Sequence, residues 1–216
     1  MDEWNVPMAL LDTVPVVLFF LGCIELMRAF YPRMSRRQYS LFSAGSVMVF
    51  LAGMMKAIWK FLYVLEICDY AILSDSFFPI QSAGFVLLAL GTAGFAIEDK
   101  KEQASHNHIP TDYRNYAAVP VTASKMPFII LTFLGTTVFY GSLASIGFRK
   151  KNKLMAVFFI GAYTFDMIQV FLATKFEESA SVMHWMAEIV NTIAQTCLWL
   201  GALRLNQEYH DEKYGY

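Results

Sequence analysis

The chain has 216 residues, of which 56% are hydrophobic and only 16% are charged, and its formal net charge at pH 7 is −1. A soluble domain carries about a quarter of its residues as charges. This composition excludes a disordered chain, a collagen-like fibre and a nucleic-acid-binding module. Long uncharged stretches alternate with short charged ones, which is typical of a membrane protein with several transmembrane helices.

The cysteines and histidines do not form a recognisable metal or redox motif. Cys23, Cys68 and Cys197 are an odd number without metal-type spacing, so the sequence predicts neither a disulfide framework nor a zinc site. His106 and His108 form a lone His-x-His, which we interpret as part of a solvated loop. We therefore expect no metal and no cofactor. The acidic N-terminus has no small-residue cleavage site after the first apolar stretch, so we expect no cleavable signal peptide.

Six stretches are long and apolar enough to cross a bilayer, which requires about 20 mostly apolar residues. They predict an all-α polytopic membrane protein with six transmembrane helices. The stretches are Met8–Phe30, Ser40–Leu65, Ser76–Ile97, Met126–Phe148, Leu154–Thr174 and Ala180–Leu203.

A polar stretch divides these segments into two groups of three. It contains many charges together with Pro110 and Pro120, a composition that hydrocarbon does not accommodate. We expect it to be a linker that does not cross the membrane. The predicted organisation is a first three-helix bundle over residues 1–97, the polar linker over 98–125, a second three-helix bundle over 126–205 and a polar tail over 206–216.

The two groups of three are weakly similar in sequence. The third and sixth stretches match at one constant offset, and the second and fifth match at nearly the same offset. Three-helix repeats whose linker stays on one side of the membrane must be inverted relative to each other, a common construction in transporters. The alternative is that apolar helices align by chance. The matches between the third and sixth stretches include Gln81 with Asn191, Leu90 with Leu200, and Gly91 with Gly201.

The positions of Lys and Arg predict the orientation, because cytoplasmic loops are enriched in both. With six spans, nine basic residues lie on one face and six on the other, which favours an N-terminus outside the plasma (inner) membrane. The basic run from Arg149 to Lys153 then faces outward, against the rule. The nine are Arg28, Arg33, Arg36, Arg37, Lys100, Lys101, Arg114, Lys125 and Lys175, and the six are Arg149, Lys150, Lys151, Lys153, Arg204 and Lys213.

Four polar residues of the sixth stretch share one side of the predicted helix. His184, Glu188, Asn191 and Gln195 are spaced by four, three and four residues, so they fall within a stripe about 60° wide. This stripe indicates a solvated or ligand-binding cavity. The alternative is that these groups form hydrogen bonds between helices in a dry core.

Ionisable residues also lie inside the second stretch, where they are costly and often functional. Lys56 and Lys60 are on one helix face, with Trp59 beside them. Two like charges on one face repel, so they require a shared anion, a carboxylate partner or one neutral member. The alternative is that both side chains extend to the headgroups.

The fifth stretch carries Asp166 near its middle, with Tyr163 and Gln169 one turn away on either side. We expect Asp166 to pair with Lys56, and Glu188 with Lys60. A purely structural ion pair is the alternative. Small residues at Gly84, Gly91 and Gly94 of the third stretch indicate close helix packing.

These patterns leave three classes of function open. The leading hypothesis is a transporter or channel-like carrier for a small polar, anionic solute. The second is a ligand-binding or sensing subunit that acts with a partner membrane protein or as a homo-oligomer, and the third is an intramembrane enzyme that uses His184, Glu188 and Asp166. No catalytic motif supports the third. The predicted ligand-binding residues are Lys56, Trp59, Lys60, Tyr163, Asp166, Gln169, His184, Glu188, Asn191 and Gln195.

Overall fold

The computed structural model of the chain describes residues 6–104, 126–175 and 181–214, and all its regular elements within these ranges are helices. The all-α fold class is therefore confirmed. Six helices are long, and the short α3 lies between α2 and α4. The helices are α1 (Val6–Phe30), α2 (Arg36–Val64), α3 (Ala71–Asp75), α4 (Phe77–Ala104), α5 (Met126–Arg149), α6 (Lys153–Lys175) and α7 (Ser181–Tyr214).

Within the described ranges, five helices are long and apolar enough to cross a membrane, namely α1, α2, α4, α5 and α6. The sixth predicted span is present as α7, which is 34 residues long. Its polar stripe lowers its hydropathy below that of the others. Helix also continues beyond two predicted boundaries, since α4 extends to Ala104 and α7 to Tyr214. The rest of the predicted linker, residues 105–125, lies outside the described residues.

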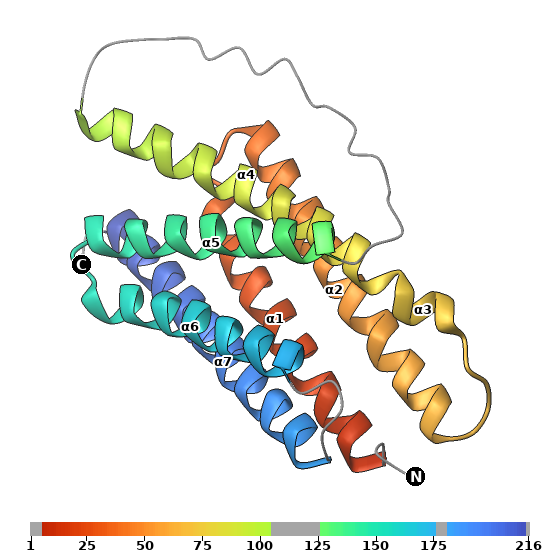
Figure 1. Cartoon of the computed structure of the whole chain (residues 1–216). Helices are drawn as coiled ribbons and strands as arrows, with labels where there is room; N and C mark the ends of the chain where they lie inside the picture. Colours follow the sequence, from red (N-terminus) through yellow and green to blue (C-terminus); the bar gives the residue numbers. More distant parts are fainter. Residues whose placement is uncertain (1–5, 105–125, 176–180, 215–216) are drawn as a thin grey trace.

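The six long helices form a closed ring in chain order (Figure 1). Each packs against its neighbours in the sequence α1, α2, α4, α5, α6 and α7, and α7 packs back against α1. Buried aromatic and aliphatic side chains fill the middle of the ring, among them Phe30, Phe42, Phe139, Tyr140 and Leu198.

The packing of α4 on α5 shows that these helices run in the same direction. Gly135, in the first half of α5, lies against Phe85, in the first half of α4. Towards the other end, the Arg149 guanidinium donates a hydrogen bond of 2.8 Å to the Ala96 carbonyl. Figure 1 shows the same arrangement. We call the end where α1, α4, α5 and α7 begin the N-terminal end of the bundle, and the opposite end the C-terminal end.

These directions do not confirm the predicted inverted repeat. The helices α5, α6 and α7 cross the bundle in the same succession of directions as α1, α2 and α4, and they occupy the opposite half of the ring. A rotation about the bundle axis therefore relates the halves, as in parallel repeats. The prediction assumed that α4 ends where α5 begins, but the structure places these two points at opposite ends.

Small residues allow the closest helix contact, between α2 and α4, as the sequence predicted. A Cβ atom added at Gly45 would lie 2.6 Å from the Gly84 carbonyl oxygen. One added at Gly91 would lie 3.0 Å from the Gln38 carbonyl oxygen. The backbones meet directly here, which fixes the depth of α2 relative to α4.

Candidate functional site

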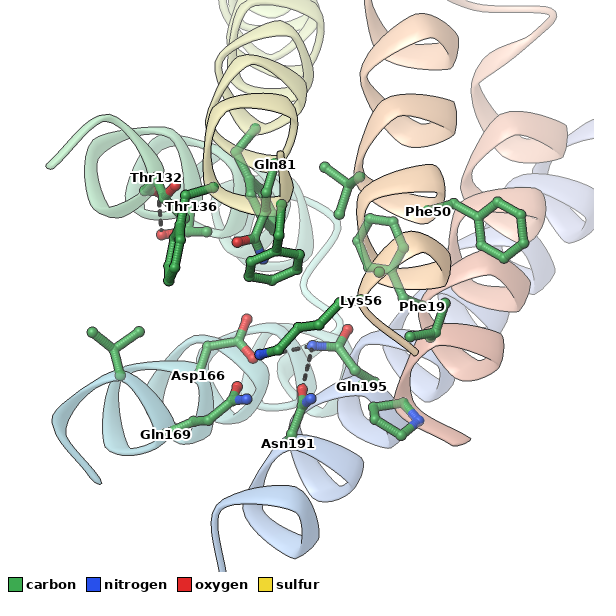
Figure 2. A pocket seen from close by; sticks show the side chains of 18 of the residues that line it. Phe19, Phe50, Lys56, Gln81, Thr132, Thr136, Asp166, Gln169, Asn191 and Gln195 are labelled. Carbon is green, nitrogen blue, oxygen red and sulfur yellow. Dashed lines mark hydrogen bonds between the residues drawn. The ribbon is translucent and has the colours of Figure 1, made fainter. Parts of the chain in front are cut away.

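A cavity of about 280 Å³ lies between the helices, toward the N-terminal end of the bundle (Figure 2). All six long helices contribute side chains to its wall. Its residues come from the early turns of α1, α4, α5 and α7 and from the later turns of α2 and α6. Because the ring is closed around the cavity, a movement of any long helix changes its shape.

The two halves of the ring contribute to this wall at equivalent positions. Residues 12, 15, 16 and 19 of α1 and 129, 132, 133 and 136 of α5 line it with identical spacing. Residues 78, 81 and 85 of α4 and 188, 191 and 195 of α7 repeat in the same way. The sequence match of Gln81 with Asn191 thus corresponds to two equivalent positions in the cavity wall.

The chemistry of the two halves differs. The first half supplies an aromatic wall, and the second half supplies most of the hydroxyl, amide and carboxyl groups. The aromatic wall consists of Phe19, Phe50, Phe77, Phe78 and Phe85. The polar wall consists of Thr132, Thr136, Asp166, Gln169, Glu188, Asn191 and Gln195.

Lys60 is buried beside the cavity and is held by two carboxylates. Its ammonium forms ion pairs with Asp12 of α1 and, at 3.4 Å, with Glu188 of α7. The predicted pairing of Lys60 with Glu188 is therefore confirmed, and Asp12 is an additional partner. Asp12 and Glu188 also line the cavity, whereas Lys60 does not. The Oδ1 atom of Asp12 is buried without a hydrogen bond.

Lys56 lies one turn before Lys60 and extends into the cavity (Figure 2). Its ammonium lies 4.6 Å from the centre of the Phe77 ring, a cation–π contact. Lys56 forms no hydrogen bond or ion pair with any residue in the described ranges. The predicted pair of Lys56 with Asp166 is therefore wrong, because Lys56 packs on α4 while Asp166 is engaged by α7.

An amide network orders the polar wall around Asp166. The Gln195 side chain donates to the Asp166 carboxylate at 3.1 Å and to the Asn191 side-chain oxygen at 3.4 Å. The Gln195 side-chain oxygen is buried without a hydrogen bond. The buried Tyr140 hydroxyl lies near Asp166 without a hydrogen bond of normal geometry. The network fixes the side chains of α6 and α7 that face the cavity.

The structure brings six of the ten predicted residues into the cavity wall: Lys56, Asp166, Gln169, Glu188, Asn191 and Gln195. The other four are Lys60, which lies behind the wall, and Trp59, Tyr163 and His184, which are not part of it. The Trp59 indole donates to Asp69 at 2.9 Å, and the Tyr163 hydroxyl shares a hydrogen bond of 3.1 Å with Thr137. The hypothesis of an active site formed by His184, Glu188 and Asp166 therefore has no support in the geometry.

Sequence reasoning missed Asp12 and the aromatic wall. Asp12 had a clear signal, since it is a carboxylate inside an otherwise uncharged part of the first apolar stretch. Gln81 was noticed only as a repeat position. The phenylalanines gave no signal, because aromatic residues occur on every face of these helices.

The fold and the cavity together define an integral membrane protein of the helical class, in which a closed ring of helices surrounds an internal cavity. Comparisons with protein-family models, curated proteins and solved structures found no match to this chain. The function is therefore inferred from the residues and geometry of the cavity.

Proposed function

We propose that the protein is a transporter or channel-like carrier for a small polar solute with a negative charge, and that Lys56 binds this charge. The observation that carries the proposal is the Lys56 ammonium, which lines the cavity and forms no ion pair with a described residue. An ammonium at membrane depth is costly without a partner. A bound anion supplies that partner.

The state of Lys60 makes this assignment specific to Lys56. The Lys60 ammonium is paired with two carboxylates, Asp12 and Glu188, so it has little attraction left for an anionic solute. Lys56 contacts the face of Phe77 and forms no ion pair with a described residue. A cation–π contact leaves the front of the ammonium available to an anion in the cavity.

The distribution of basic residues supports an N-terminus outside and a C-terminal end in the cytoplasm. Among the Lys and Arg residues of the described ranges, twelve lie toward the C-terminal end, whereas Lys175 lies at the N-terminal end and Lys56 and Lys60 lie inside the bundle in the later turns of α2. The run from Arg149 to Lys153 then obeys the positive-inside rule. The cavity faces the outside in this orientation. The twelve are Arg28, Arg33, Arg36, Arg37, Lys100, Lys101, Arg149, Lys150, Lys151, Lys153, Arg204 and Lys213.

One observation is also compatible with the second candidate, a ligand-binding or sensing subunit. Toward the C-terminal end, packed aromatic rings fill the interior. The ring centroid of Phe30 lies 5.4 Å from that of Phe42 and 5.1 Å from that of Phe95. A carrier in its outward-facing state has such a closed end, and so does a receptor that never opens inward. Transport distinguishes them.

The experiment is anion uptake into proteoliposomes that contain the purified full chain. Radiolabelled monocarboxylates, dicarboxylates, phosphate and sulfate are the probes. We expect uptake of at least one anion above that of empty liposomes, and loss of that uptake in Lys56→Met. The matched control is Lys151→Met, an exposed lysine far from the cavity, which should transport like the wild type. Binding of an anion without uptake would favour the sensing subunit, and the absence of both would refute the proposal.

A further inference from the structure

We infer that the solute is a small monocarboxylate with an apolar, preferably aromatic, body. This inference rests on the proposed role of Lys56 and specifies what the same cavity selects. It follows from three properties of the wall: its charge, the distribution of its phenylalanines and its size.

The charge of the wall favours a single negative charge on the solute. Lys56 is the only basic residue that lines the described cavity, while Asp12, Asp166 and Glu188 are carboxyls of the same wall. A phosphate, sulfate or dicarboxylate would bring a second negative charge toward these carboxyls. Sites for such anions ordinarily use arginine forks or several donors, and the described lining contains no arginine. One ammonium matches one carboxylate.

The phenylalanines favour an apolar body attached to that carboxylate. Lys56 lies over Phe77, and Phe77 is next to Phe78 with a ring-centroid distance of 5.1 Å. Phe19 and Phe85 form a second edge-to-face pair at 6.3 Å. A solute whose carboxylate meets Lys56 therefore has aromatic rings beside its remaining atoms. Burial of apolar surface against them contributes to binding in proportion to the area removed from water.

The cavity volume limits the solute to a small molecule. At about 280 Å³ it is just below the range of about 300–1,000 Å³ that is usual for drug-sized ligands. A benzene ring that carries a two- or three-carbon acid is of suitable size. 3-Phenylpropionate is accordingly the probe that combines the single charge, the ring and the size.

The carboxylate of Asp166 suggests a competing solute, a zwitterion whose ammonium would meet Asp166. Asp166 already accepts a hydrogen bond from Gln195, so it is less available than Lys56. Phenylalanine differs from 3-phenylpropionate only by this ammonium. Comparison of the two therefore distinguishes a monoanion site from a zwitterion site.

The test is equilibrium binding to the purified full chain, measured by calorimetry. We expect 3-phenylpropionate to bind at least about tenfold more tightly than acetate, which lacks the ring, and than 3-phenylpropanol, which lacks the charge. Lys56→Met should abolish this preference over the alcohol, Lys56→Arg should keep it, and Lys151→Met should bind like the wild type. Retained preference in Lys56→Met, or tighter binding of phenylalanine, 3-phenylpropylamine or phosphate, would overturn the inference.

Failure of this inference differs from failure of the proposed function. If phosphate enters the proteoliposomes while 3-phenylpropionate neither binds nor enters, the carrier proposal stands and the monocarboxylate inference falls. If 3-phenylpropionate binds through Lys56 but no anion enters, the inference stands and the carrier proposal falls.

Discussion

The ion-pair cluster of Lys60, Asp12 and Glu188 should be a major contribution to the stability of the bundle. The exposed fractions of these side chains are 3%, 7% and 12%, so solvent screens them little. Lys60→Met would leave two neighbouring carboxylates without their shared cation. Loss of one partner of a buried ion pair costs about 3–5 kcal/mol. We therefore expect Lys60→Met to lower the free energy of unfolding by this amount, as measured by denaturant titration in detergent micelles.

Lys56→Met is the matched control, because it makes the same substitution one turn away on the same helix. Lys56 has no ion pair within the described ranges, so its loss removes a cation–π contact worth about 1 kcal/mol. Neutralisation of both carboxylates, by Asp12→Asn and Glu188→Gln, should restore much of the stability of Lys60→Met. Equal losses in Lys56→Met and Lys60→Met, or no recovery in the triple variant, would refute the assignment of the buried cluster.

Two further predictions concern topology and packing. The first is tested by cysteine labelling in a variant without native cysteines. Asp75→Cys and Met126→Cys should react with an impermeant thiol reagent from one side of the membrane, and Glu98→Cys should react from the other side. Reaction of the Glu98 and Met126 variants from the same side would instead support the inverted arrangement. Gly45→Ala should destabilise the protein by about 1–3 kcal/mol because its Cβ would meet backbone atoms, whereas Gly141→Ala, which has no atom within 4 Å of its Cβ, should be nearly neutral in the same denaturant titration.

The sequence predicted the helices well because hydropathy and length are local properties. All six predicted spans correspond to long helices, and the polar stripe of α7 does face the cavity through Glu188, Asn191 and Gln195. His184 belongs to the same stripe but lies in the first turn of α7, outside the wall. Helical periodicity therefore predicted the inner face of α7 correctly and left open how far along this face the cavity extends.

The pairing of charges and the direction of α5 could not be obtained in this way. Helical periodicity does not show which neighbouring helix a side chain meets, so Lys56 was matched with Asp166 although Asp166 is bound to Gln195. The direction of a helix after a long connection is likewise not encoded in its hydropathy. In the inverted arrangement, the run from Arg149 to Lys153 violates the positive-inside rule.

The parallel arrangement has a consequence for how an asymmetric cavity arises from a repeated scaffold. Rotation about the bundle axis places the two halves at the same depth, so equivalent positions face each other across the cavity. Where the first half has Pro15, Phe19 and Phe85, the second half has Thr132, Thr136 and Gln195. Inverted halves would instead place equivalent positions at opposite depths. The parallel ring thus sets an aromatic wall against a polar wall, which a solute with one charged and one apolar end requires.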